Sequence, residues 1–176
     1  SDLNLLARRF AQVRAASLRL AEPLSAEDCQ VQSMPDASPT KWHLAHVTWF
    51  FETFVLERFE PAFKPFDTRY RVLFNSYYHG IGEQHPRAQR GLITQPTLAD
   101  VKRWRVQVDE RVQALLLSRG DDVAMARLIE LGLQHEQQHQ ELLLTDIKHA
   151  LSFCPGHAPY AQGWPITSVR PEAMRW

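Results

Sequence analysis

The most informative stretch of the chain is DDVAMARLIELGLQHEQQHQELLLTDIKHAL, which covers residues 121–151. Apolar residues recur in it three or four positions apart, which predicts an α-helix. His135 and His139 lie four residues apart, so both imidazoles lie on one face, about 6 Å apart along the axis. At about 100° per residue they share that face with Leu128, Leu131, Leu142 and Asp146. We therefore expect both histidines on the apolar, core-facing stripe of this helix.

Three further helices are predicted upstream. Apolar spacing indicates one over 3–20 and an aromatic one over about 39–59, which Ser38-Pro39 begins and Pro61 ends. Thr97 and Asp100 resemble a capping box that begins the next helix, whose apolar positions are Val101, Trp104, Val108, Val112, Leu115 and Leu116. Gly120 ends that helix, and the fourth begins at Asp121 and Asp122. This pattern predicts an all-α four-helix bundle.

The connection over 61–96 is far longer than the usual link between bundle helices, and such long loops are usually functional or disordered. Its aromatic content favours order. Arg87 and Arg90 lie three residues apart within it, and a guanidinium group binds a carboxylate through paired, charge-assisted hydrogen bonds. The two arginines are therefore candidates for carboxylate binding, with solvated surface side chains as the alternative.

Composition excludes some classes of function. The 176 residues are 44% hydrophobic, which is typical of one globular domain. Because 20 basic residues balance 20 acidic ones, the chain has no excess positive charge with which to bind nucleic acid or anionic lipid. No apolar run reaches the ~20 residues that span a bilayer. Cys29 and Cys154 form no CxxC motif, which favours reduced thiols in a cytoplasmic protein.

The histidine pair predicts a metal site. Two buried imidazoles without partners would each cost about 1–3 kcal/mol, and one metal ion would satisfy both; histidines satisfied by other groups are the alternative. Helix 39–59 offers His46 or His43 as a third ligand, and His46 is favoured because it shares a face with Trp42, Trp49 and Phe50. Three neutral imidazoles suit iron or zinc and leave coordination positions open for substrate.

His135-Glu136-Gln137-Gln138-His139 also fits the HExxH signature of zinc peptidases, in which the glutamate is the general base. One common type requires glycine and histidine where Leu142 and Thr145 stand. The other requires a downstream helical glutamate, and the only candidate, Glu172, lies in a proline-rich tail. A peptidase is therefore a minor alternative.

Three motifs together resemble a known family. The stretches SPTKWHLAHVTWFFETFVL (38–56), LFNSYYHGIGEQHPRAQRGL (73–92) and HEQQHQELLLTDIKHAL (135–151) resemble the N-terminal DinB-like domain of the iron-dependent sulfoxide synthases of ergothioneine biosynthesis, the EgtB type. The resemblance implies a DinB-like four-helix bundle with a long functional loop between helices two and three. It also implies that His46, His135 and His139 bind Fe(II), with dioxygen as co-substrate.

The resemblance further implies the substrates. Gln138 is expected to contact hercynine, the trimethylated betaine of histidine. Arg87 and Arg90 are expected to hold the carboxylates of a thiol substrate, γ-glutamylcysteine or cysteine. The implied reaction uses dioxygen to join the thiol sulfur to the imidazole ring and to oxidise it to a sulfoxide.

The domain boundaries follow from the proline and glycine residues after Cys154 together with the same resemblance. Residues 1–153 are predicted to form the metal-binding bundle, and 154–176 an irregular tail or linker toward a C-terminal domain related to formylglycine-generating enzymes. That domain is expected to supply the catalytic tyrosine, so none is assigned here, and Tyr77 and Tyr78 are only nearby aromatics. The alternatives are a standalone DinB-like divalent-metal thiol S-transferase and a non-catalytic helical module.

Overall fold

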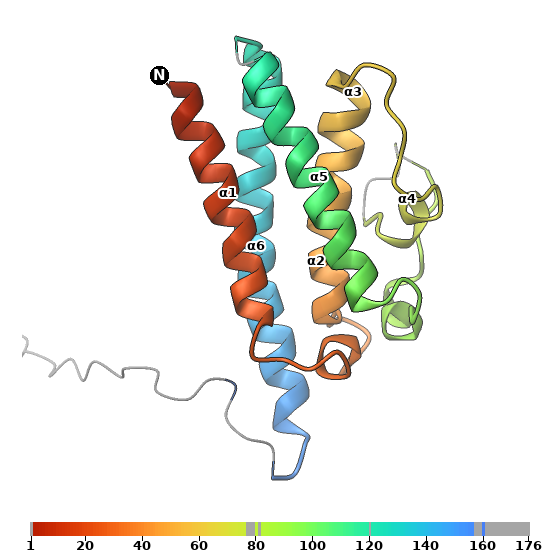
Figure 1. The fold of residues 1–176 in the computed structure, drawn as a ribbon. Coiled ribbons are helices and arrows are strands. Elements are labelled where there is room, and N and C mark those ends of the chain that lie inside the picture. The colour runs from red at the N-terminus through yellow and green to blue at the C-terminus, as the bar shows by residue number, and fades with distance from the viewer. Residues whose placement is uncertain (1, 77–79, 81, 120, 157–159, 161–176) are drawn as a thin grey trace, which may run out of the picture.

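Four long helices build the described part of the chain (Figure 1). The computed structural model describes residues 2–76, 80, 82–119, 121–156 and 160. Helix α1 spans Asp2–Ala21, α5 spans Leu98–Ser118 and α6 spans Val123–Ser152. The fourth is continuous but has three parts, α2 (Thr40–Phe50), a π-helical turn (Phe51–Leu56) and α3 (Glu57–Phe59). Because the described residues contain no strand, the all-α prediction is confirmed.

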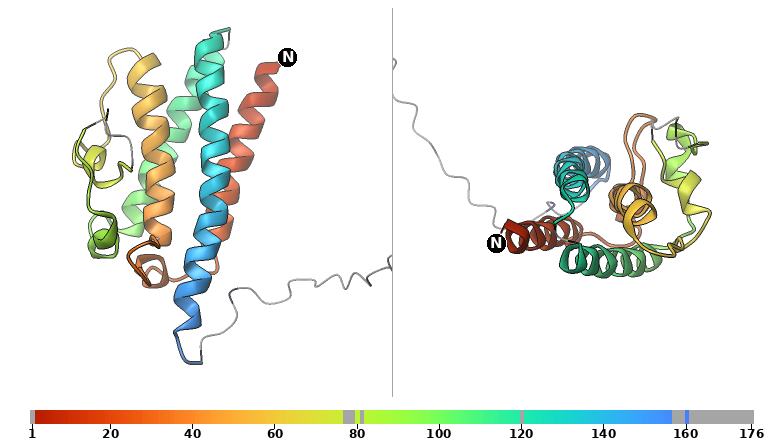
Figure 2. Two further views of the ribbon diagram at one scale, coloured as in Figure 1. Left: turned by 180° about the vertical axis from the view of Figure 1, so that it is seen from behind. Right: turned by 90° about the horizontal axis from the view of Figure 1, so that it is seen from above.

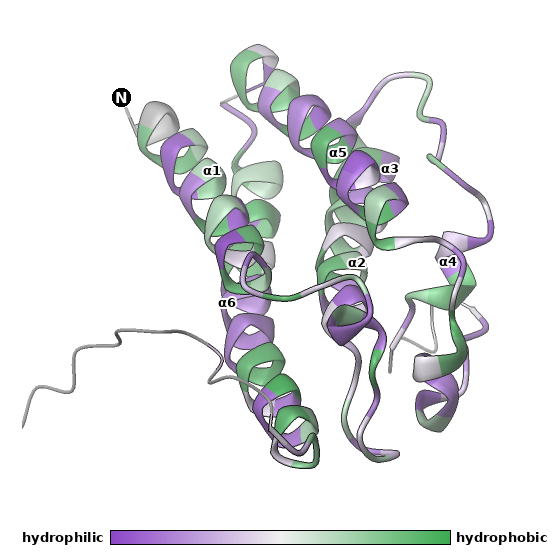
Figure 3. Cartoon of the chain, turned by 60° about the horizontal axis from the view of Figure 1, so that its bottom comes forward, coloured by the Kyte–Doolittle hydropathy of each residue, from purple (hydrophilic) through white to green (hydrophobic). Residues whose placement is uncertain are grey.

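The four helices form a bundle in which α1 contacts α5 and α6, and α2 contacts the same two helices. Helices α1 and α2 therefore lie diagonally opposite each other, as do α5 and α6, an arrangement visible from above (Figure 2). Hydrophilic and hydrophobic residues alternate along α1, α5 and α6 (Figure 3), as the packing of one face requires, whereas every residue of α2 is buried. Among the described helices, no segment combines the length and the apolar character that a membrane span requires.

Capping side chains confirm two of the predicted helix starts, whereas α2 begins at Thr40 with Pro39 at the N-cap position and no side-chain cap, so Ser38 does not cap it. The Thr97 hydroxyl accepts a hydrogen bond from the Asp100 backbone N–H, and the Asp100 carboxylate accepts one from the Thr97 N–H, which completes a capping box. Asp122 caps α6 by accepting from the Met125 N–H. All six apolar positions predicted for α5 are buried. Gly120, the predicted end of that helix, lies outside the described residues.

The long connection packs against the outer side of α2 and α5 (Figure 1). It carries two short elements, α4 (Tyr70–Leu73) and a 3-10 helix (Arg87–Leu92), and another 3-10 helix (Asp28–Gln30) precedes α2. Tyr70, Phe74 and Ile93 anchor the connection in the core. Tyr77 and Tyr78 lie outside the described residues, as does most of the predicted linker over 154–176.

The predicted core stripe of α6 is wrong in its orientation. Leu131 and Leu142 are 57% and 41% exposed. The buried face instead comprises Met125, Ile129, Gly132, Leu133, Glu136, Leu143 and Ile147. At about 100° per residue, its centre lies about 100° from His135 and 60° from His139. The charged residue Glu136 lies at that centre. A prediction from the spacing of apolar residues places charged residues on the exposed face, and it therefore misplaced the buried face of α6. The two histidines thus lie at the edge of the core.

Candidate metal centre

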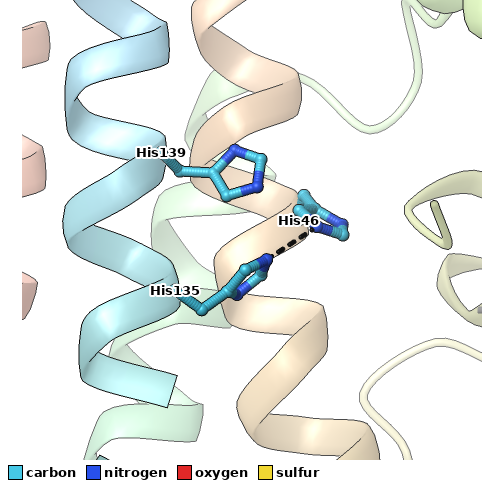
Figure 4. A group of neighbouring side chains, drawn as sticks. All are labelled: His46, His135 and His139. Carbon is cyan, nitrogen blue, oxygen red and sulfur yellow. Dashed lines mark hydrogen bonds between the residues drawn. The ribbon is translucent and has the colours of Figure 1, made fainter. Parts of the chain in front are cut away.

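Helices α2 and α6 bring three histidines together. His46 projects from α2, and His135 and His139 project from successive turns of α6 toward it (Figure 4). One ring nitrogen of each lies within 4.8 Å of the others, and the Nε2 atoms of His46 and His135 are 3.2 Å apart. Two nitrogens bound to one ion at about 2.0–2.1 Å would be separated by roughly 3.0–3.4 Å. The spacing of this pair therefore fits two ligands of a single metal ion.

The hydrogen bonds of His46 leave its Nε2 available. Its Nδ1 donates to the Phe74 backbone carbonyl over 2.7 Å, so the Nε2 atom of the neutral ring carries the lone pair. The ring is stacked between Trp42 and Trp49, with centroid distances of 4.6 and 5.5 Å. His135 Nδ1 is buried and has no hydrogen-bond partner among the described residues. The Nε2 atoms of His46 and His135 face each other at 3.2 Å, and a cation bound between them would accept the lone pairs of both.

Burial keeps the three imidazoles neutral. Desolvation, with a smaller contribution from His135, lowers the pKa of His46 well below its usual 6.5. Desolvation likewise lowers the pKa of His135 to about 4. Desolvation and the neighbouring imidazoles also lower the pKa of His139. Because a metal binds the deprotonated ring nitrogen, neutral rings at pH 7 need lose no proton before they bind.

His43, the other possible ligand on α2, lies beside the cluster rather than in it. Its Nδ1 is 2.9 Å from Nδ1 of His139, and its Nε2 is 2.8 Å from Oδ2 of Asp146. Burial lowers the pKa of His43 even though Asp146 opposes this shift. The geometry therefore favours His46 over His43 as the α2 ligand.

A pocket of about 270 Å³ opens onto the histidines. All six predicted site residues line it, namely His46, His135, His139, Arg87, Arg90 and Gln138. The structure therefore brings together residues from α2, α6 and the long connection that are far apart in the sequence. Its volume is sufficient for a small metabolite rather than a macromolecule.

The two arginines differ in their surroundings. Arg90 is buried, donates to the Ser38 and Ser76 hydroxyls over 3.0 Å each, and lies 3.5 Å above the Trp42 ring. Arg87 is exposed and donates to the Asp36 backbone carbonyl. Arg90 is thus a buried part of the pocket wall, whereas Arg87 lines the pocket from an exposed position.

Comparison with known families agrees with this architecture. A family model described as the DinB superfamily matches residues 9–143, which include all three histidines. The chain belongs to the DinB superfamily. A comparison with curated proteins finds no match. A DinB superfamily fold with a three-histidine cluster that can hold a metal ion indicates a metal-dependent enzyme.

Glu136 has a structural environment in this DinB superfamily protein that argues against the peptidase alternative. It is fully buried and accepts hydrogen bonds from Arg14 Nη1 (2.9 Å), Arg105 Nη2 (3.0 Å) and the Ser17 hydroxyl (2.6 Å). Both carboxylate oxygens are thus engaged in the core of the bundle, and Glu136 is not among the residues that line the pocket. A general base must reach a water in the site, and Glu136 has no such access.

Sequence reasoning missed several pocket residues of the DinB domain. Asp36, Ser38 and Ser76 come from irregular segments, and Trp42 was interpreted only as core. Asp146 carried a usable signal, because it shares a helix face with His135 and His139. His149, near the end of α6, is partly buried with its Nδ1 2.7 Å from the Ser33 hydroxyl.

Proposed function

We propose that this chain is the metal-binding domain of a non-haem Fe(II)-dependent sulfoxide synthase that joins a thiol, γ-glutamylcysteine or cysteine, to hercynine in ergothioneine biosynthesis. One observation carries the proposal: a single pocket is lined by the three histidines, Gln138 and both arginines. The sequence resemblance supports the choice of substrates. The DinB superfamily match supports the metal-dependent fold but is silent on the reaction.

The donor set suits an anionic substrate. Three neutral imidazoles leave the full charge of a divalent ion uncompensated, so the site favours an anionic ligand such as a thiolate. Arg87 at the pocket mouth would pair with the substrate carboxylate, while Arg90 contributes positive charge from its fixed place against Trp42. Gln138 would donate to or accept from the imidazole of hercynine.

The proposed reaction balances with one dioxygen. A C–H bond of the imidazole and the S–H bond of the thiol break, a C–S bond forms, and the sulfur gains one oxygen atom while the other becomes water. Bound iron would supply the redox chemistry that couples these two two-electron oxidations to the four-electron reduction of dioxygen. The protein would hold the two substrates in contact, so that the reaction would not depend on their chance encounter in solution.

The test combines metal binding and turnover. The chain and the full-length product of its gene are loaded anaerobically with Fe(II), and oxygen consumption is followed with hercynine and each thiol, with the product identified by mass spectrometry. Sulfoxide formation that needs both substrates supports the proposal. Metal binding without oxygen use, but with transfer of the thiol to an electrophile, would favour the S-transferase alternative instead.

The substrate assignment has a matched test. Arg87→Gln is expected to raise the KM for the thiol by about 10–100-fold through loss of a charge-assisted pair, with kcat much less affected. Arg8→Gln, at an exposed position of α1 away from the pocket, serves as the control. An unchanged KM in Arg87→Gln would remove the carboxylate role of this residue.

A further inference from the structure

A chain of hydrogen bonds runs from the N-terminal end of α2 to one of the cluster histidines. The Ser38 backbone N–H donates to Oδ2 of Asp146 over 2.9 Å, and the same oxygen lies 2.8 Å from Nε2 of His43. Nδ1 of His43 lies 2.9 Å from Nδ1 of His139. These contacts join the segment before α2, α2 itself and α6. They connect a carboxylate at the pocket wall to the back of a candidate metal ligand.

The chemistry of the carboxylate determines which atom donates and which accepts in each of these hydrogen bonds. An ionised carboxylate can only accept, so Nε2 of His43 must carry the hydrogen that bridges to Asp146. In a neutral ring, Nδ1 of His43 then carries the lone pair and accepts from His139. His139 therefore donates through Nδ1, and its Nε2 is left as the nitrogen with a free lone pair. With the His43 ring neutral, reversing either of its hydrogen bonds would place two donors or two acceptors face to face.

The arrangement parallels that of His46, whose Nδ1 also donates to a protein oxygen, the Phe74 carbonyl. The carbonyl is a fixed acceptor of the backbone, whereas His139 depends on two side chains, His43 and Asp146. His43 is 3% exposed, and the Ser38 N–H holds the carboxylate that orients it. The orientation of His139 thus depends on His43 of α2 and, through it, on Asp146 of α6 and the Ser38 N–H before α2.

We infer that His43 and Asp146 are positioning residues, which hold His139 in the tautomer protonated at Nδ1 and so present its Nε2 to the metal. The inference rests on metal binding by the three histidines, one part of the proposed function, and not on the reaction. Partners of this kind, which donate to or accept from the outer nitrogen of a ligand, typically contribute 10–100-fold to metal affinity. Neither residue is required to touch the ion.

The tautomer can be observed without metal. Long-range ¹⁵N–¹H correlation spectra of the metal-free protein at pH 7.5 should show His139 protonated at Nδ1 and His43 protonated at Nε2. In His43→Leu the preference of His139 for Nδ1–H should disappear. A wild-type His139 protonated at Nε2, or a His43 ring protonated at both nitrogens, would overturn the inference whether or not the protein binds metal.

Metal affinity gives the second readout, with Co(II) alone as the probe. His43→Leu and Asp146→Ala should each weaken Co(II) binding by about 10–100-fold. His43→Gln should bind within a few-fold of wild type, since its amide can accept from His139 through Oε1 and donate to Asp146 through Nε2. His149→Leu, which removes a histidine on the same helix outside the cluster, is the matched control and should bind as wild type.

These outcomes separate the two hypotheses. Wild-type protein that binds no Co(II) but shows the expected tautomers would contradict the metal proposal and leave the hydrogen-bond chain intact. Equal Co(II) affinity in wild type, His43→Leu and Asp146→Ala would overturn the positioning role even where metal binds. If His43→Leu does not fold, as judged by circular dichroism, His43→Gln and Asp146→Ala still decide the question.

Discussion

Substituting Gly132 by alanine tests the packing that holds α6 against the π-helical turn. Gly132 is buried on α6, one turn before His135. A Cβ atom added there would lie 2.5 Å from Cε1 and 2.7 Å from Cζ of Phe51, and 3.0 Å from Cε1 of Phe50. Carbon atoms in favourable contact are about 3.5–4.0 Å apart, so the ring or the helix must move by roughly 1 Å.

The surroundings of Phe51 decide the sign of the effect. Its ring is fully buried, packs edge-on against Phe10 at 5.1 Å, and lies under the Arg14 guanidinium at 5.3 Å. Overpacking of such a core costs about 1–3 kcal/mol, and a contact this short falls at the upper end. Replacement of glycine by alanine within a helix stabilises the folded state by about 1 kcal/mol through the higher helix propensity of alanine. We expect a net loss of about 1–2 kcal/mol in the free energy of unfolding.

Urea denaturation of Gly132→Ala measures this loss, and the melting temperature should fall by about 2–8 °C. Phe51→Leu provides the matched background, because it removes the ring atoms that collide. In that background Gly132→Ala should be neutral or stabilising, which a double-mutant cycle would detect. Because Gly132 precedes His135 by one turn, the single variant should also bind Co(II) more weakly. Stabilisation by about 1 kcal/mol in the wild-type background would refute the close packing of α6 on the π-helical turn.

Three other predictions concern charge, thiols and metal. Glu136→Gln leaves the Arg14 and Arg105 guanidinium groups in the core without their shared counter-charge. Denaturant titration should therefore show a loss of about 3–5 kcal/mol in the free energy of unfolding; an unchanged denaturation midpoint would contradict this. Burial acts to raise the pKa of Glu136, but Arg14 and Arg105 outweigh it and hold the pKa below its usual 4.5. Its stabilising effect is therefore complete above pH 4.5 and is lost as the pH falls through the lower folded-state pKa, so wild type should lose more stability on acidification than Glu136→Gln does. Burial raises the pKa of the Cys29 thiol to about 11, whereas Cys154 is exposed. At pH 8 Cys154 should therefore react rapidly with a disulfide reagent and Cys29 only on unfolding; rapid reaction of both thiols would show that Cys29 is accessible. Alanine at His46, His135 or His139 should each abolish stoichiometric Co(II) binding while His149→Ala retains it, and binding that survives all three single substitutions would disprove the cluster as the site.

The parts of the fold that depend on neighbours in sequence were predictable. The buried positions of α5 follow from helical spacing after a capping box, and both signals lie between Thr97 and Leu116. The spacing of His135 and His139 is equally local. The π-helical turn at Phe51–Leu56 has no comparable signal, because it interrupts a stretch whose apolar residues suit an uninterrupted helix.

The parts of the site that depend on tertiary contacts were not predictable. A backbone carbonyl such as that of Phe74 carries no residue-type signal, yet it anchors His46. Arg90 stacks on Trp42 across 48 positions of sequence, and pattern reasoning left it as either a carboxylate ligand or a surface residue. Its burial between Ser38, Ser76 and Trp42 is a consequence of how the long connection folds back onto α2.

Two adjacent residues of α6 explain why the site lies at the edge of the bundle. Glu136 points into the core, where it joins Arg14 of α1 and Arg105 of α5, so one carboxylate links three helices. His135, about 100° around the helix, is thereby turned away from that centre and toward His46 and the pocket. A purely apolar residue at position 136 would bury equally well but would not fix the rotation of α6 about its own axis, since hydrophobic contacts are non-directional. The short, paired hydrogen bonds of the Glu136 cluster are directional, and they therefore help to determine which face of α6 presents its histidines to the candidate metal site.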